Sequence, residues 1–388
     1  MSALAWLDFD EAERSRMQQL IALFQEQETR DELGMGSVRD FISDQLFPGT
    51  STIQTRLRYM LFVPWILRSL ESRSGTSQQL KEDGRRLELR LIAALCKGQE
   101  QAGVIGATVG DGLQRLPSSI YWPGLAHWGI RQFEGALESY FESLAFLRER
   151  RGGQQREDSS PVSFWHAALP APPPGYLDEC SFRLTAEEAQ FIIDRLVATH
   201  PDCLLTWLAR NGDAGMADAI WMHPSFDAFT ARHQALVRHA QQFSDVMHGA
   251  ALVYNLLLSE RRQDSVLTDA YLQDLAEWAD GLDSAAVRAW QPEELFAQMA
   301  QAGVAARPPL RKFVLAWKQA VEADPGRVAG DSDARQLVEG RERQMKGNQS
   351  RFVNSARLSA WNGASGTQPL SYRWYRAQSH LQDLANAR

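Results

Sequence analysis

Polar and basic side chains are concentrated in one stretch of the sequence, FPGTSTIQTRLRYMLFVPW, which begins at Phe47. Gln54, Arg56 and Arg58 alternate along it, and no acidic residue interrupts it. A guanidinium group can bind phosphate oxygens through two hydrogen bonds, and a helix N-terminus adds backbone donors for an anion. These three residues are therefore candidate phosphate-binding groups. A buried hydrogen-bond network that fixes the turn to a neighbouring helix explains the same side chains, because buried polar groups need partners in any fold.

A second basic region lies near the C-terminal end, in residues 341–376. It holds seven arginine or lysine residues and one glutamate, whereas the whole chain has a net charge of −7. Basic residues with interleaved aromatic rings can contact phosphates and stack on bases. Packing of this region against the acidic remainder of the chain is an equally good explanation. The candidate nucleic-acid contacts here are Arg351, Arg357, Arg373, Trp374 and Arg376.

Residues typical of metal sites and nucleophiles are present, but not in the patterns that such chemistry needs. Asp245 and His248 are three residues apart, which on a helix is more typical of a surface hydrogen bond than of a metal site. The glycines of residues 103–112 lack the following Gly-Lys-Ser/Thr of a phosphate-binding loop, and no GxSxG or HExxH occurs. The sequence therefore predicts no metal, no cofactor and no identifiable catalytic residue.

The composition is that of an ordinary globular chain of 388 residues, with 44% hydrophobic and 23% charged residues. A net charge of −7 argues against attraction of the whole molecule to nucleic acid, so any such contact needs a local patch. Cys96, Cys180 and Cys203 lie far apart and form no disulfide or zinc pattern, which favours a reducing cytoplasm. We expect a cytoplasmic protein without membrane contact, because no signal-peptide pattern and no apolar run of ~20 residues occurs.

Apolar residues recur at helical spacing along most of the chain, and strand-like alternation is nearly absent. Asp8 with Glu11, and Thr185 with Glu188, have the spacing of capping boxes, which start helices. Further helices are predicted at residues 77–97, 132–148, 226–243, 246–260, 266–279, 293–302 and 310–321.

The apolar run Tyr59–Leu67 predicts a buried helix that starts at Thr50–Thr52 and is kinked by Pro64. Farther along the chain, the tripeptide from Trp122 to Gly124 predicts a turn, because proline followed by glycine is typical of turns.

The sequence predicts an all-α fold, a multi-helix array of two helical subdomains with an irregular basic C-terminal segment. Residues 149–180 are rich in glycine, serine and proline, which is typical of a linker. This places an N-terminal helical domain at residues 1–148 and a C-terminal helical domain at residues 181–340. A basic aromatic tail then covers residues 341–388.

Three motifs, STIQTRLRYMLFVPW, YWPGLAHWGIRQF and WNGASGTQPLSYRWYRAQ, resemble those of an uncharacterised bacterial family, a domain of unknown function. The resemblance runs nearly end to end, through LTAEEA at Leu184–Ala189 and LVYNLLLSE at Leu252–Glu260. It implies a genomic neighbourhood of helicases and phospholipase D-type nucleases in antiviral defence loci. The family's basic-aromatic YRW pattern is matched at Tyr372–Trp374, and the resemblance implies no catalytic residues.

These observations lead us to expect a non-enzymatic helical component of a bacterial antiviral defence assembly. We expect it to bind a helicase or phospholipase D-type nuclease partner, and DNA through a local basic patch. Two alternatives stay open at this point. One is an enzyme that processes nucleic acid or nucleotides at an unfamiliar helical site around Arg56 and Arg58, and the other is a purely structural scaffold.

Overall fold

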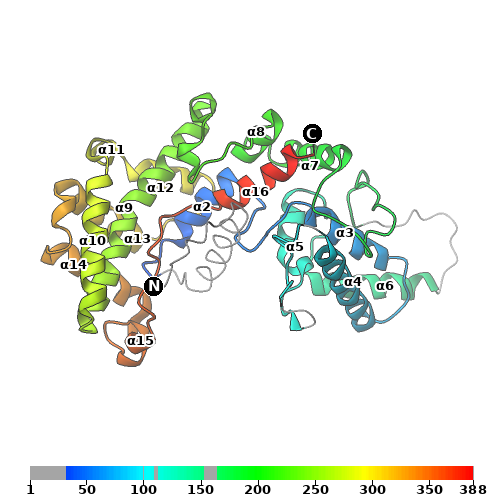
Figure 1. Ribbon diagram of the computed structural model, residues 1–388, viewed down its shortest axis with the longest axis horizontal. Coiled ribbons are helices and arrows are strands. Elements are labelled where there is room, and N and C mark those ends of the chain that lie inside the picture. Colours follow the sequence, from blue (N-terminus) through cyan, green and yellow to red (C-terminus); the bar gives the residue numbers. More distant parts are fainter. Residues whose placement is uncertain (1–31, 99, 109–111, 153–163, 388) are drawn as a thin grey trace, which may run out of the picture. The chain divides into compact units, whose positions relative to one another are not determined.

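The computed structural model describes residues 32–98, 100–108, 112–152 and 164–387. These residues are all-α, as the sequence predicts, and their one β feature is an isolated bridge between Arg131 and Trp165 (Figure 1). The helix predicted after Asp8 and Glu11 lies outside the described residues, as does part of the predicted linker, residues 153–163. Within the described residues, no helix is long and apolar enough to cross a membrane.

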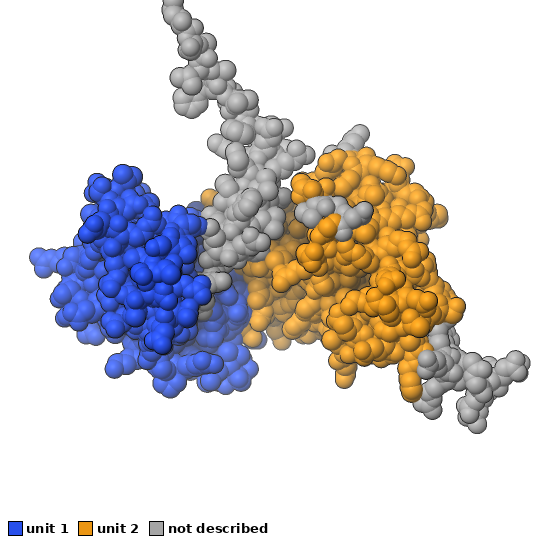
Figure 2. Space-filling view, turned by 90° about the horizontal axis from the view of Figure 1, so that it is seen from below, with its two compact units in different colours: residues 1–43, 219–372 blue, residues 44–218, 373–388 orange. Residues whose placement is uncertain are grey.

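The chain forms two compact units, each built from separate stretches of sequence (Figure 2). Unit 1 comprises residues 1–43 and 219–372, and unit 2 comprises residues 44–218 and 373–388. The chain first leaves unit 1 and enters unit 2 within helix α2, Gly36–Leu46. The predicted boundaries at residues 148 and 180 lie inside unit 2, and the one at residue 340 lies inside unit 1.

Helix α3 is the centre of unit 2, because every residue from Tyr59 to Leu67 is buried. It packs against α4 and α5 and includes Pro64. The helices of unit 2 are α3 (Tyr59–Leu70), α4 (Ser77–Lys97), α5 (Pro117–His127), α6 (Leu137–Gly152), α7 (Ala186–Thr199), α8 (Leu204–Asn211) and α16 (Trp374–Ala385).

Capping explains where two of these helices begin. Thr185 and Glu188 form the predicted capping box of α7, in which each side chain accepts a hydrogen bond from the other residue's backbone N–H. Thr76 and Gln79 do the same for α4, which spans the range predicted for it. In both cases local chemistry satisfies the free backbone donors that a helix start would otherwise leave unpaired.

Two local predictions were wrong. The helix with the apolar run does not start at Thr50–Thr52 but at Tyr59, and the residues between form turns. The tripeptide from Trp122 to Gly124 is not a turn but lies inside α5. In α5, Pro117 begins the helix, where its missing N–H is not needed, and Pro123 lies inside the helix.

Unit 1 is organised around α9, a helix of 31 residues. Helices α10, α13 and α14 pack along it (Figure 1). The predicted helices at 226–243 and 246–260 are thus one continuous helix after a short 3-10 turn. The helices of this unit after residue 219 are η2 (Ile220–Met222), η3 (Phe226–Ala228), α9 (Ala231–Arg261), α10 (Ser265–Gly281), α11 (Ser284–Ala289), α12 (Pro292–Gln301), α13 (Pro308–Ala323), η4 (Pro325–Arg327), α14 (Ser332–Lys346), η5 (Gly347–Gln349) and α15 (Ser355–Ser359).

Tryptophans attach the surrounding helices of unit 1 to α9. The indole N–H of Trp278 donates to the carbonyl of Asp245 at 2.7 Å, and that of Trp317 donates to the carbonyl of Val246 at 2.8 Å. Gly249 makes room for the first ring, because a Cβ there would lie 2.2 Å from a ring carbon of Trp278. These contacts bury large apolar rings and still satisfy their polar N–H groups.

Candidate functional site

The polar segment before α3 is a turn whose own side chains close it. The amide of Gln54 accepts a hydrogen bond from the Ser51 N–H at 3.1 Å and donates to the Gly49 carbonyl at 3.1 Å. Thr50 donates from its hydroxyl to the Phe47 carbonyl at 2.6 Å. Gln54 is 1% exposed. Its amide therefore replaces the backbone bonds that a helix would have made here.

Helix α5 and a glycine loop hold the same turn from another direction. The hydroxyl of Tyr121 accepts from the Thr55 N–H at 2.8 Å and donates to the Arg56 carbonyl at 2.7 Å. The Thr55 hydroxyl donates to the carbonyl of Gly103 at 2.7 Å. Close approach depends on Gly124 of α5, where a Cβ would lie 2.5 Å from the Gly49 carbonyl oxygen. Gly124, which the sequence predicts in a turn, thus lies inside a helix and allows the Gly49 backbone to approach closely.

Helix α16 supplies donors to carbonyls that the turn leaves free. Arg373 donates to the Thr50 carbonyl at 2.9 Å, and Arg376 donates to the Thr52 carbonyl at 2.9 Å. Both contacts join residues that are more than three hundred positions apart in sequence. The C-terminal helix therefore completes the hydrogen bonding of the turn before α3.

Arg56 forms the strongest link between the turn and α16. Its Nε and Nη2 donate to the Asp383 carboxylate at 3.0 and 2.7 Å, and its Nη1 contacts Glu100 at 2.5 Å. Asp383 also accepts from the Leu57 N–H at 2.8 Å. Burial lowers the pKa of Arg56, but the hydrogen bonds and charges of Asp383 and Glu100 outweigh it and raise the pKa. The guanidinium therefore stays charged in a paired, half-buried setting.

Arg58 is bound to α7 in an almost fully buried pair. Its Nη2 contacts Glu188 at 2.7 Å and its Nη1 donates to the Ser181 carbonyl at 2.8 Å. Its side chain is 7% exposed and that of Glu188 is 4% exposed. The guanidinium also lies over the Phe62 ring, 5.3 Å from the centroid. One oxygen of Glu188 thus caps α7 while the other holds Arg58, which positions α7 against α3.

Two further residues of α16, Trp374 and His380, are also buried. Trp374 is 1% exposed, donates from its indole to the Ala217 carbonyl at 2.8 Å, and packs on Phe47 with ring centroids 5.7 Å apart. His380 is 1% exposed, and neither ring nitrogen has a hydrogen-bond partner among the residues that the structure describes. Burial, followed by the charges of Arg376 and Arg56, lowers the pKa of His380 to about 3. A neutral imidazole is therefore enclosed beside two guanidinium groups.

The basic region that precedes α16 belongs to unit 1 and has its own acids. Arg351 contacts the Glu32 carboxylate at 2.9 Å and donates to the hydroxyls of Tyr254 at 2.8 Å and Ser365 at 3.1 Å. Lys346 contacts the same Glu32 carboxylate. Glu32 is 5% exposed, so the carboxylate sits between two cations away from solvent.

Arg357 differs from the other predicted residues because it is exposed. It lies in the short helix α15, and its Nε donates to the amide oxygen of Gln349 at 2.9 Å. All eight predicted residues fall within the described chain, and the structure brings six of them together around the turn and α16 in unit 2. Arg351 and Arg357 lie in unit 1. The eight are Gln54, Arg56, Arg58, Arg351, Arg357, Arg373, Trp374 and Arg376.

Sequence reasoning missed the acids that hold these cations. Asp383, Glu188 and Glu32 lie far from their partners in sequence. Only Glu188 carried a signal, since its capping-box spacing showed a helix start, although not its second partner. Direct phosphate contact by the arginines stays a prediction. Within the described residues, no group of three or more His, Cys, Asp or Glu side chains is arranged to hold a metal ion.

Comparison with known proteins gives one match. The model of DUF6361, a family of unknown function, matches residues 1–388. No curated protein and no solved structure matches the chain. The family match agrees with the resemblance seen in the motifs around the turn and the C-terminal helix.

Proposed function

We propose that this chain, which belongs to the DUF6361 family of unknown function, is a non-enzymatic helical component of a bacterial antiviral defence assembly. Its proposed partner is a helicase or a phospholipase D-type nuclease. The observation that carries the proposal is that the arginines of the family-like motifs bind other parts of the same chain. Arg56 binds Asp383, and Arg58 binds Glu188. Arg376 binds the Thr52 carbonyl. Residues that hold elements of one protein together favour a binding component over a phosphate-processing enzyme.

The proposed partner-binding surface is the α14–α15 segment, residues 343–359 of unit 1. Met345 and Val353 are 45% and 57% exposed there, although both are large apolar side chains. Arg343 and Arg357 are exposed in the same segment. Apolar side chains flanked by arginine are typical of the anchors of protein interfaces.

Co-purification tests the proposal. The full-length chain would be co-expressed with each proposed partner, a helicase or a phospholipase D-type nuclease, and the complex isolated through a tag on the partner. We expect Val353→Asp to reduce recovery at least about tenfold, the scale of one lost interface anchor. Val266→Asp is the matched control, since Val266 is 77% exposed on α10, outside the segment. No complex with either partner at micromolar concentrations contradicts the proposal.

DNA binding is the second part of the proposal and needs different variants. Replacing Arg351 or Arg373 removes an internal contact, so a loss of binding would not separate DNA contact from misfolding. Arg343→Gln with Arg357→Gln changes exposed cations instead. We expect a low-salt mobility shift that weakens with salt and with this double substitution. A partner complex without such a shift would favour a pure scaffold.

A further inference from the structure

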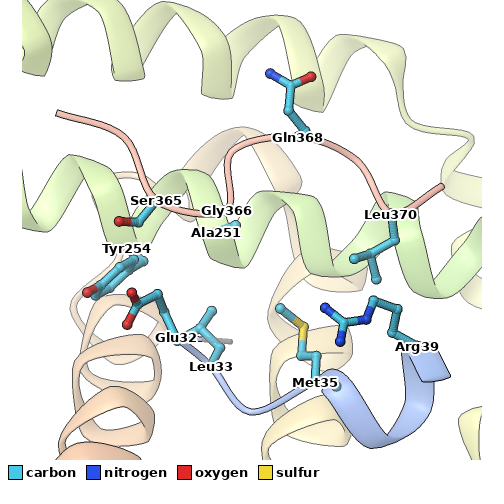
Figure 3. A pocket seen from close by; sticks show the side chains of 11 residues that line it. Glu32, Leu33, Met35, Arg39, Ala251, Tyr254, Ser365, Gly366, Gln368 and Leu370 are labelled. Carbon is cyan, nitrogen blue, oxygen red and sulfur yellow. The ribbon is translucent and has the colours of Figure 1, made fainter. Parts of the chain in front are cut away.

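A pocket in unit 1 lies between three parts of the chain that are distant in sequence (Figure 3). The N-terminal approach to α2 forms one wall, α9 forms the second, and the segment before α16 forms the third. Its cavity volume is about 80 Å³, enough for a few water molecules or part of a small organic molecule. The lining residues that matter here are Leu33, Met35, Arg39, Ala251, Tyr254 and Leu370.

One end of the pocket is polar, and its groups already contact Arg351. Glu32, Tyr254 and Ser365 gather there (Figure 3), and Arg351 contacts all three at 2.8 to 3.1 Å. Lys346 adds a second cation to Glu32. An anionic ligand gains little at this end, because Arg351 is already engaged with these three residues. The middle is apolar, with Leu33 and Ala251.

Arg39 is the lining cation of the pocket that has unused hydrogen-bond donors. It extends from α2 toward Met35, beneath Leu370 (Figure 3). Its Nε contacts Asp40 at 3.1 Å, whereas its two terminal nitrogens donate no hydrogen bond to any described residue. Its side chain is 38% exposed. A guanidinium with two free parallel donors beside an apolar cavity is suited to a carboxylate oxygen pair.

The charged residues that line the pocket are Arg39 and Glu32. Glu32 contacts Lys346 and Arg351, so Arg39 is the lining cation that a bound anion would meet. The apolar part of such an anion would replace water next to Leu33, Ala251 and Leu370.

We propose that this pocket is a binding site for a small organic carboxylate with a short apolar body. The carboxylate pairs with the terminal nitrogens of Arg39, and the apolar body lies along Leu33, Ala251 and Leu370. The residues that line the pocket lie outside the segment 343–359 proposed for the partner, so either proposal can fail without the other.

Three probes of equal length test the site on the full-length chain: hexanoate, hexan-1-ol and hexylamine. Ligand-observed NMR titration measures the affinity of each. We expect hexanoate to bind with a Kd on the order of 1 mM, as for ligands of this size, and at least about tenfold more tightly than the other two. Absence of hexanoate binding up to about ten times that concentration, or equal binding of all three probes, overturns the proposal.

Two substitutions place the binding in this pocket. Arg39→Gln should remove the preference for hexanoate over hexan-1-ol while leaving weak binding of both. Ala251→Leu should fill the apolar middle and abolish binding of all probes, because Ala251 lines the pocket and is 6% exposed. Arg288→Gln, which changes an exposed arginine of α11, is the control. Unchanged melting temperature shows that each variant is folded, and unchanged hexanoate preference in Arg39→Gln overturns the proposal.

Discussion

The two units join early and late parts of the chain through ion pairs of opposite arrangement. In unit 2 the early segment supplies the cation, Arg56, and the late helix α16 supplies the acid, Asp383. In unit 1 the early segment supplies the acid, Glu32, and the late segment supplies Lys346 and Arg351. The cation of such a pair can therefore come from the early or from the late segment. The net charge of a segment does not show whether its charged side chains lie on the surface.

The settings of the two pairs also differ. Asp383 is 4% exposed and also accepts the Leu57 N–H, so its loss would remove the acceptor of that N–H and of the Nε and Nη2 of Arg56. Glu32 is equally buried, but its cations Lys346 and Arg351 are 21% and 18% exposed. The side chain of Arg56 is less accessible to water, because it is 12% exposed. The comparison predicts that unit 2 depends more on its carboxylate than unit 1 does.

The largest expected effect tests this difference directly. Asp383→Ala should destabilise unit 2 by about 3–5 kcal/mol, the cost of breaking a buried ion pair, because Arg56 is left with the exposed Glu100 as its acidic partner and the Leu57 N–H loses its acceptor. Glu32→Ala should cost about 1–2 kcal/mol, because Arg351 keeps its hydroxyl partners and Lys346 can reach solvent. Urea unfolding followed by tryptophan fluorescence, with hydrogen exchange to locate the change, measures both. Equal costs would refute the difference between the units.

Close packing at the turn is the second test. Gly124→Ala should destabilise unit 2 by about 2–3 kcal/mol, because the added methyl meets the Gly49 carbonyl oxygen and forces α5 away from the turn. Gly340→Ala is the matched control in unit 1, where nothing lies within 4 Å of the added methyl. It should stabilise α14 by about 0.5–1 kcal/mol through helix propensity. A neutral Gly124→Ala would mean that the turn and α5 separate easily.

Much of the secondary structure was predictable, because helix periodicity and capping boxes are local. The α4 range and the start of α7 agree with the prediction. The errors have a physical origin in tertiary contacts: Gln54 and α16 satisfy the turn's backbone, so residues 50–58 do not need to be helical. Likewise, Gly124 lies in a helix rather than in a turn, and its lack of a side chain allows the Gly49 carbonyl to approach closely.

The candidate site was predictable only in part. Gln54, Arg56 and Arg58 stood out because polar side chains preceded an apolar helix, and six of the eight predicted residues do meet in unit 2. Their partners could not be found from one sequence, since Asp383 and Arg56 are separated by most of the chain. The pocket beside Arg39 was not predicted, because three separate segments create it and none carries a motif.

The third expected effect concerns pH and the buried imidazole of unit 2. The pKa of His380 is lowered from 6.5 to about 3, so the unfolded chain takes up a proton below pH 6.5 while the folded chain does not. Its contribution to stability is complete above pH 6.5 and is lost as pH falls toward 3. Between pH 7.5 and 5.5 the loss should be about 1.4 kcal/mol.

Comparison with His380→Leu isolates this contribution. Glu88 and Asp245, with pKa values raised by burial to about 7 and about 6, change stability in the opposite direction as pH falls. Both are present in the variant as well, so the difference between the two pH profiles belongs to His380. Parallel profiles would show that the imidazole becomes protonated without opening unit 2.

The discontinuous build of unit 2 has a consequence for biosynthesis. Translation produces the turn and α3 early. The part of unit 1 that comprises residues 219–372 is made later, and α16 is made after it. Until α16 leaves the ribosome, Arg56 and the Leu57 N–H lack the carboxylate that holds them, and the α3 region lacks one of its neighbours. Unit 1 can therefore finish folding before unit 2, although synthesis of unit 2 begins before most of unit 1 is made.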